Sequence, residues 1–312
     1  MIKKNIFLFI IISLIFSSNW ENIQTNNIEE IKFELVYSNI DNTVLDFVLD
    51  DFYFEDALND EYDVVKILNG ASNLEEGNPD VPHITKSIII PDNGLMSYEI
   101  LDYEYIEYTN INIAPSKGNL SRNINPKDVE YHFSDTYSLN EYYPQNIVEL
   151  REPYILRDLR GQTIVITPFQ YNPLENKLRV YTNIRIGINN IGIDQRNILR
   201  RTVVPSLDNE FNNIYSDHFI NFENDTRFDY LTDHGRMLII SYGDFIDEMQ
   251  PLVDWKNKKG IRTDIVGVNE IGSNVNDIED YVENYYYENG LVYLLLVGDV
   301  AQIPTPIING AS

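Results

Sequence analysis

Two apolar runs near the end of the chain decide the fold: MLII at residues 237–240 and LVYLLLV at residues 291–297. Each has the length of one buried strand. The second is apolar at every position, which is typical of a central parallel strand covered on both faces. The residues between them contain two stretches in which apolar side chains recur at helical spacing. We therefore expect a βαβαβ unit, with a parallel sheet and right-handed crossovers, over residues 235–312.

The first helix of this unit should begin near Met249 or Gln250. Pro251 requires this start, because proline is tolerated in the first turn of a helix and penalised in its interior. Gly260 should end the helix, since glycine readily takes the left-handed conformation that follows a helix.

The second strand of the unit is expected over Ile261–Val268. The second helix should then begin at Asn274 or Asn276, because an asparagine side chain can cap the free N–H groups of a helix start. Gly290 should close this helix immediately before the third strand.

The residues upstream have the period of strands. Ile31, Phe33, Leu35 and Tyr37 fall on one face at a spacing of two. The same alternation returns in a later segment, at Leu178, Val180, Ile184, Ile186 and Ile188. No long helix is expected between residues 32 and 190. We therefore predict a multi-domain protein, in which an all-β, sandwich-like front domain precedes the C-terminal unit.

Residues 190–234 form a transition rich in Asn and Asp. A short helix is expected around Asn209–Tyr215. Residues 225–235 are typical of a linker, so we place the domain boundary there.

The first residues have the pattern of a secretory signal peptide over residues 1–20. Lys3 and Lys4 precede the apolar run Ile6–Phe16, and the small residues Ser17 and Ser18 follow it. The run is short for a membrane span, although an N-terminal anchor is the alternative. We expect the mature protein to be secreted or held at the cell surface, with no membrane span of its own.

The composition excludes several classes of function. The net charge is -26, and a cationic surface is needed to neutralise the phosphates of nucleic acids, so no nucleic-acid partner is expected. An anionic membrane surface is disfavoured for the same reason. Carboxylates could hold calcium, but a solubilising acidic surface is the simpler interpretation.

The sequence contains no complete catalytic or phosphate-binding motif among those considered. It has no Cys, no G-x-G-x-x-G after the first strand of the C-terminal unit, no phosphate-binding P-loop and no G-x-S-x-G motif. The carboxyl ends of the predicted parallel strands, where ligands of such sheets gather, carry Ser241, Asn269, Glu270 and Asp299. Asp299 stands where a functional carboxylate would stand, yet an Asp that fixes a turn after a strand is the simpler interpretation.

The histidines are also unpaired in sequence. They are His83, His132, His218 and His234. None has metal-ligand spacing and none ends a predicted strand of the parallel sheet, so surface or structural roles are expected. We assign no catalytic residue, no cofactor-binding residue and no specific metal ligand in this chain.

Several segments nevertheless resemble one peptidase family. The spacing of V-D-W-K-x-x-K-G before Y-x-L-L-V-G-D is specific. The C-terminal segments that resemble the start of a gingipain-type cysteine peptidase domain are Gly235–Ile240, Leu252–Thr263, Tyr293–Asp299 and Ile303–Pro304. The front-domain segments that resemble the gingipain prosegment are Arg151–Pro153, Arg157–Gly161, Pro168–Pro173 and Leu178–Tyr181.

The resemblance implies a secreted endopeptidase zymogen. It implies a signal peptide over residues 1–20, an all-β inhibitory prodomain over residues 21–230, and the first part of a caspase-like α/β peptidase domain over residues 235–312. In such a family a Cys nucleophile and a His partner cut protein or peptide substrates, and the prodomain binds its own catalytic domain. Catalysis requires no cofactor, and structural calcium is implied.

The chain departs from the family in one respect. The family's catalytic His and Cys follow the V-G-D strand, and none of the 312 residues is Cys. We therefore expect the N-terminal portion of a longer precursor, or a truncated inactive form, with no peptidase activity of its own. The alternative function is a non-catalytic secreted β-rich binding or inhibitor module. Arg200, Arg201 and Arg236 are candidates for prodomain cleavage, although ordinary surface arginines are the simpler interpretation.

Overall fold

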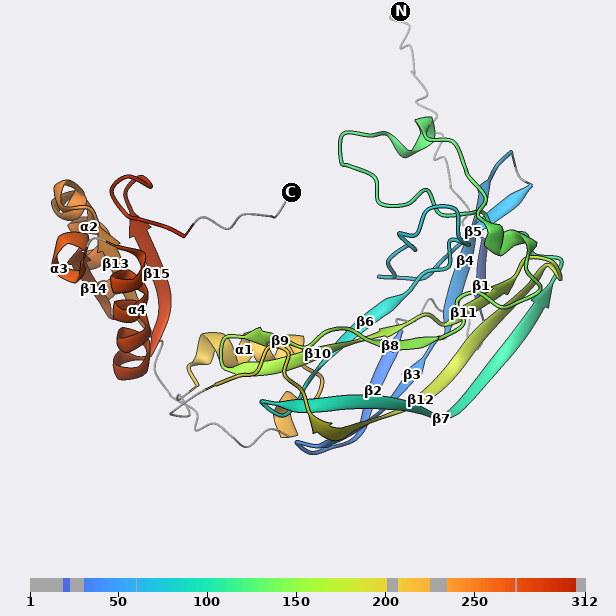
Figure 1. Ribbon diagram of the computed structural model, residues 1–312, viewed down its shortest axis with the longest axis horizontal. Helices are drawn as coiled ribbons and strands as arrows, with labels where there is room; N and C mark the ends of the chain where they lie inside the picture. The colour runs from blue at the N-terminus through green and yellow to red at the C-terminus, as the bar shows by residue number, and fades with distance from the viewer. Residues whose placement is uncertain are drawn as a thin grey trace, which may run out of the picture.

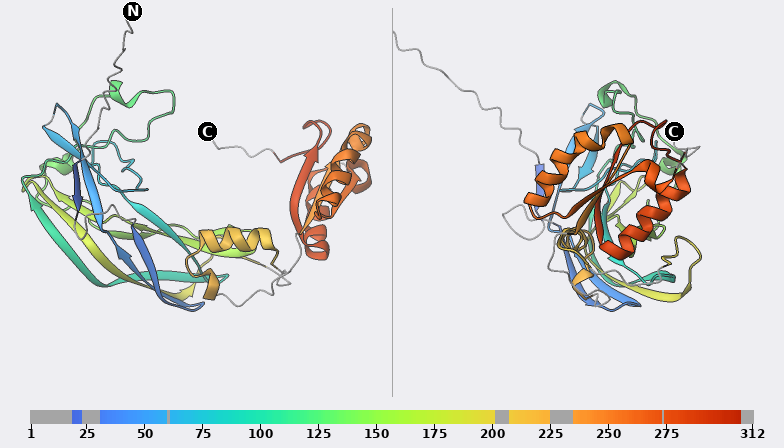
Figure 2. Two further views of the ribbon diagram at one scale, coloured as in Figure 1. Left: turned by 180° about the vertical axis from the view of Figure 1, so that it is seen from behind. Right: turned by 90° about the vertical axis from the view of Figure 1, so that its left-hand side faces the viewer.

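The computed structural model describes residues 19–22, 31–59, 61–200, 207–224, 235–272 and 274–306 (Figure 1). The predicted signal peptide lies outside these residues, except for its last two positions. Residues 225–234 of the predicted linker, which include His234, lie outside them as well. Figure 1 and Figure 2 show a β-rich front domain and a smaller C-terminal unit of helices packed on a sheet.

The front domain consists mainly of strands. Those among the described residues are β1 Asn19–Asn22, β2 Lys32–Ser38, β3 Asn42–Val48, β4 Asp51–Ala57, β5 Tyr62–Lys66, β6 Ile84–Ile89, β7 Gly94–Thr109, β8 Val148–Leu150, β9 Tyr154–Leu156, β10 Leu159–Ile166, β11 Phe169–Asn172 and β12 Lys177–Ile193. The helical segments are the short 3-10 helices η1 Pro126–Asp128, η2 Asp135–Ser138 and η3 Phe222–Asn224, and the α-helix α1 Asn209–His218. The expected absence of a long helix before residue 190 agrees with this order.

The long strand β12 organises the front domain. It pairs with β7 along most of its length and with β11 and β3 on its other side, while β2 extends the sheet beyond β3. A second sheet contains β6, β10 and β8, with β9 also paired to β10. A third contains β1, β4 and β5.

The first two sheets share one core. Leu45 and Phe47 of β3, Ile186 of β12, Ile88 of β6 and Ile164 of β10 are all buried in the same apolar cluster. The alternation predicted for β12 is confirmed, because its five apolar residues on one face are fully buried. The two layers over one core give the front domain its sandwich-like character.

One local prediction for the front domain was wrong. Tyr37 was expected on the buried face of β2 but is 54% exposed, because a bulge between Leu35 and Tyr37 shifts the register against β3. The segment Phe169–Asn172 forms β11, whose four residues are buried against β12.

One charged side chain lies inside this β structure. Arg160 of β10 is 0% exposed, and its guanidinium donates to the backbone carbonyls of Pro91, Gly94, Arg196 and Asn197. Asp194 lies 3.4 Å from it. Burial is possible because a guanidinium has five N–H donors and nearly all of them find acceptors here.

The C-terminal unit has the predicted βαβαβ order. Its elements are β13 Arg236–Ser241, η4 Gly243–Phe245, α2 Ile246–Lys258, β14 Thr263–Gly267, α3 Val268–Ile271, α4 Val275–Asn289 and β15 Leu291–Val297. All strand pairs in this sheet are parallel. Asn274 caps α4 by accepting the N–H of Asp277, and Gly290 ends it with φ +71°. Gly260, with φ +87°, follows α2 as predicted.

The predicted start of α2 was wrong. The helix begins at Ile246 and places Pro251 in its second turn. Packing outweighs the proline here, because the side chain of Ile246 lies against Gly267, and Met249 and Val253 join the cluster beneath β13.

The predicted central position of the last strand was also wrong. The strand order is β14-β13-β15, so β13 is central and β15 is an edge of the described sheet. Leu294 and Leu296 of β15 are 44% and 42% exposed. An apolar run indicates that a strand can be covered on both faces of the sheet. It does not indicate whether the strand has a neighbouring strand on each side.

None of the helices in the described residues is long and apolar enough to cross a membrane.

Candidate functional site

The carboxyl edge of the β14-β13-β15 sheet brings together the polar residues predicted there. The ends of β13 and β14 are adjacent, since a Cβ on Gly243 would lie 3.9 Å from the side-chain nitrogen of Asn269. Two of the predicted groups are already engaged by nearby backbone. The buried Ser241 hydroxyl donates to the Tyr242 carbonyl at 3.0 Å, and Glu270 accepts the N–H of Gly267 at 3.2 Å.

Asp299 has the structural role that the sequence favoured. Its carboxylate accepts the N–H of Val300 at 2.7 Å, and its own N–H donates to the side chain of Gln302 at 2.8 Å. These bonds close the turn that follows β15. The edge therefore has the position of an active-site face, but among the described residues it holds no nucleophile paired with a base.

The three histidines in the described part of the chain, His83, His132 and His218, do not form a metal site. His83 is half-buried, and burial followed by the charge of Arg151 lowers its pKa. His218 has its Nε2 atom 2.6 Å from the Tyr154 hydroxyl, and burial lowers its pKa. His132 is exposed. Within the described ranges, no group of three or more His, Cys, Asp or Glu residues could hold a metal ion.

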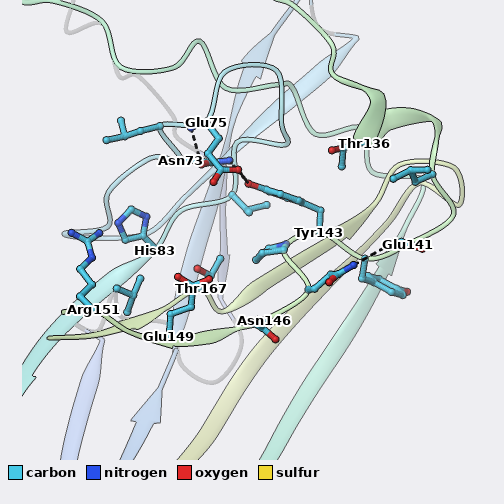
Figure 3. Close-up of a pocket in the computed structure, with 17 residues that line it drawn as sticks. Asn73, Glu75, His83, Thr136, Glu141, Tyr143, Asn146, Glu149, Arg151 and Thr167 are labelled. Carbon is cyan, nitrogen blue, oxygen red and sulfur yellow. Dashed lines mark hydrogen bonds between the residues drawn. The ribbon is translucent and has the colours of Figure 1, made fainter. Parts of the chain in front are cut away.

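A surface cavity of about 540 Å³ opens in the front domain. Figure 3 shows its polar lining, which comes from residues 73–83 on one side and from residues 136–167 on the other. Tyr143 lies between the two sides. Its hydroxyl donates to Glu75 at 2.8 Å and accepts from Asn73 at 2.9 Å. Burial and the bond to Glu75 raise the pKa of Tyr143 to about 12.

The charged groups of this cavity surround His83. Glu149 and Arg151 face the half-buried His83, and the cationic Arg151 opposes its protonation. The polar groups form hydrogen bonds across the lining, and no activated hydroxyl stands beside a base. Sequence reasoning missed this cavity, because its two sides are more than fifty positions apart and share no motif.

The candidate cleavage residue Arg236 is also part of the structure. It is the first residue of β13, and its guanidinium lies 3.6 Å from Asp264 of β14. Tyr285 of α4 donates a hydrogen bond to the same carboxylate. These contacts agree with the simpler interpretation of Arg236 as a surface residue that holds two strands and a helix together.

Comparison with known families identifies both parts of the chain. The family described as Propeptide_C25 matches residues 42–228, which is more than half of the chain. Peptidase family C25 matches residues 230–309.

The chain belongs to the C25 peptidase precursors.

Curated relatives of this C25 precursor include the gingipains of Porphyromonas gingivalis. Gingipain R1 is 35% identical over 247 residues, which are 77% of this chain and 24% of the relative. Gingipain R2 of strain ATCC 33277 is 33% identical over 272 residues, 85% of this chain and 37% of the relative. The C25 precursor described here thus spans a quarter to little more than a third of the length of these relatives. Lys-gingipain is 26% identical over 257 residues.

A solved structure also resembles part of this chain. The complex of Porphyromonas gingivalis RgpB pro- and mature domains contains a chain with a TM-score of 0.57 and 28% identity to the C25 precursor. The match covers 62% of this chain and 97% of that one. The resemblance to a gingipain-like peptidase precursor, drawn from the V-D-W-K and V-G-D segments, is confirmed.

Proposed function

We propose that this chain provides the latent stage of a secreted gingipain-like cysteine endopeptidase. Its front domain, residues 21–230, binds and inhibits the peptidase domain that begins at residue 235, and that domain has the caspase-like α/β fold. The order of the two family matches along one chain carries this proposal, since a propeptide followed directly by its peptidase is the order of a zymogen.

Two features support binding by the front domain. Part of this chain resembles a chain from a complex of pro- and mature domains. The front domain also contacts the C-terminal unit directly, through a hydrogen bond from Arg157 to the Leu291 carbonyl. This contact lies at the amino end of β15, so it supports binding between the two parts of the chain, while inhibition rests on the zymogen order of the two family matches.

We propose that this chain keeps the peptidase inactive and does not itself hydrolyse peptides. A thiolate must attack the scissile carbonyl in this class of peptidase, with His as the proton carrier, and the 312 residues include no Cys. The carboxyl edge of the sheet, where Asp299 fixes a turn, supplies the rim of the active-site face. Structural calcium remains a prediction of the family resemblance.

Export is proposed on the signal-peptide pattern of residues 1–20. Expression of the 312-residue chain in a bacterium with an outer membrane should yield a secreted product that has lost the signal peptide, residues 1–20. A product that keeps Met1 and stays with the cytoplasmic membrane would favour the N-terminal anchor instead.

Inhibition is tested by titrating the purified 312-residue chain into active gingipain R1, its relative at 35% identity. Hydrolysis of a fluorogenic peptide should fall with added chain and saturate at a fixed stoichiometry. The chain alone should release no fluorophore, with or without a thiol reagent. Undiminished gingipain activity at micromolar chain would contradict the inhibitory role, and hydrolysis by the chain alone that resists the thiol reagent would contradict the assignment of latency.

A further inference from the structure

The turn between β9 and β10 carries an arginine where a smaller residue is expected. The register pairs Leu156 with Leu159, so Arg157 and Asp158 form a two-residue hairpin loop. Arg157 has φ +50°, a conformation that such loops favour at their first position and that usually selects Gly or Asn. For a long side chain this backbone costs about 1–2 kcal/mol. An arginine kept in this conformation indicates a use for its side chain.

The guanidinium of Arg157 is fixed first by its own domain. One nitrogen donates to Asp208, the N-cap residue of α1, at 3.0 Å. Its Nε atom lies 3.5 Å from Asp158, which in turn accepts a hydrogen bond from the buried Tyr215 at 3.0 Å. The ring of Phe211 packs at 3.9 Å from the guanidinium carbon. These contacts fix the orientation of the guanidinium group at the surface of the front domain.

The remaining donors reach the C-terminal unit. The second terminal nitrogen donates to the carbonyl of Leu291, the first residue of β15, at 2.8 Å. The ring of Tyr286 in α4 lies 4.9 Å from the guanidinium carbon on that side. The Arg157 side chain is only 14% exposed. Figure 1 and Figure 2 show α4 and β15 beside the end of the front domain that carries α1 and β9.

The chemistry on the two sides is complementary. β15 is an edge of the described sheet, so the Leu291 carbonyl is open to a donor from another element. The pKa of Tyr293 in β15 is raised, mainly by burial. The negative charges of Glu210 in α1 and of Asp208, its N-cap, also raise it, so they lie near this strand. Arg157 also lines an apolar cavity of about 670 Å³ with Ile278 of α4 and Leu294 of β15. The contact therefore combines the Arg157 guanidinium, the backbone carbonyl of Leu291 and the aromatic rings of Phe211 and Tyr286.

We propose that Arg157 is the docking residue that fixes the front domain on its own peptidase domain, at the end of α4 and the start of β15. This inference deepens the proposed function, on which it rests, by naming the surface and the partner. The site is recognised by a backbone carbonyl and the Tyr286 ring. A lysine cannot replace the arginine, because one ammonium group lacks the planar fork that spans Asp208 and Leu291 together.

The absence of cysteine from the sequence allows a direct test on the intact chain. Ser216 in α1 and Glu283 in α4 are exposed. Each is changed to Cys and spin-labelled, and the distance between the labels is measured by pulsed electron paramagnetic resonance. The otherwise unchanged chain should give one narrow distance. In Arg157→Ala this narrow distance should be replaced by a broad distribution of distances. The reason is that loss of the charge-assisted contacts lowers the ratio of docked to undocked molecules by about 10- to 100-fold.

Two further variants complete the test. Arg185→Ala is the matched control, since Arg185 pairs with Asp46 on the surface of the same domain and should leave the narrow distance unchanged. Arg157→Lys should broaden the distribution as Arg157→Ala does, and it replaces that variant if the alanine protein does not fold. A broad distribution in the unmutated chain, or a narrow one in a folded Arg157 variant, would overturn the docking site. Peptidase inhibition is measured separately, so neither result decides the inhibitory role.

Discussion

Replacement of the buried Arg160 by Met tests how the front domain is held together. Methionine retains an apolar stem of similar length but removes every donor. The guanidinium donates to the carbonyls of Pro91 at 2.9 Å, Gly94 at 2.8 Å, Arg196 at 3.0 Å and Asn197 at 2.9 Å. These acceptors come from two separate segments, so Arg160→Met leaves both without their link to β10.

The expected loss follows from the orphaned carbonyls. The Gly94 carbonyl is buried, and leaving it without a partner costs about 1–3 kcal/mol; the other three bonds are only partly buried, and the loss of each costs about 0.5–1.5 kcal/mol, so the four together cost about 4 kcal/mol. The ion pair adds little, because Asp194 keeps a closer partner in Arg196 at 2.9 Å. A loss of about 4 kcal/mol is a large part of the 5–15 kcal/mol that a folded domain typically has. Arg160→Lys, with three donors in place of five, should lose about half as much.

Urea unfolding followed by circular dichroism measures this loss. Arg185→Met is the control, since Arg185 also pairs with an aspartate but is 47% exposed. Its removal should cost no more than about 1 kcal/mol. The reasoning is refuted if Arg160→Met unfolds within about 1 kcal/mol of Arg185→Met, because the four carbonyls would then find other donors at little cost.

Three smaller changes test other parts of the structure. Hydrogen bonds from Arg196 lower the pKa of Asp194 to about 2. Since this lies below the unfolded value of about 3.9, the carboxylate stabilises the fold above about pH 4 and ceases to do so as the pH falls toward 2. Asp194→Asn should therefore be less stable than the unmodified chain at neutral pH, and urea unfolding at acidic pH should show the difference vanish; a constant difference would contradict this. Tyr215→Phe removes a buried hydroxyl that donates to Asp158 and accepts its N–H, and thermal unfolding should show a loss of about 1–3 kcal/mol that the exposed Tyr287→Phe lacks. Asn274→Ala should weaken α4 by about 1 kcal/mol through loss of its cap; equal loss in Asn276→Ala, a change of an exposed residue within the helix, would show that the cap is not the cause.

Much of the fold was predictable because it depends on local periodicity. The alternation in β12 and the cap and stop residues of α4 are properties of a few neighbouring positions, and the structure agrees with them. The errors arose where distant contacts decide. The bulge that exposes Tyr37 depends on pairing with β3, and the start of α2 depends on the packing of Ile246 against Gly267.

The site was less predictable than the fold. Asp299 was correctly placed at the carboxyl edge of the sheet and correctly interpreted as a turn residue. The cavity around Tyr143 could not be found, since its two sides meet only after folding. The segment Arg157–Gly161 was noticed only as a resemblance. Nothing in its letters says that Arg160 points into the core while Arg157 reaches another domain.

The separation of Arg157 from Leu291 along the chain sets the order in which the two sides of their contact are synthesised. The two residues are 134 positions apart. At a synthesis rate of about 5–20 residues per second, the ribosome needs roughly 7 to 27 seconds to go from one to the other. A β domain of ordinary size folds within milliseconds to seconds. The hairpin that carries Arg157 and the helix α1 that holds it are both translated before Leu291, so the front domain's half of this contact precedes its partner along the growing chain.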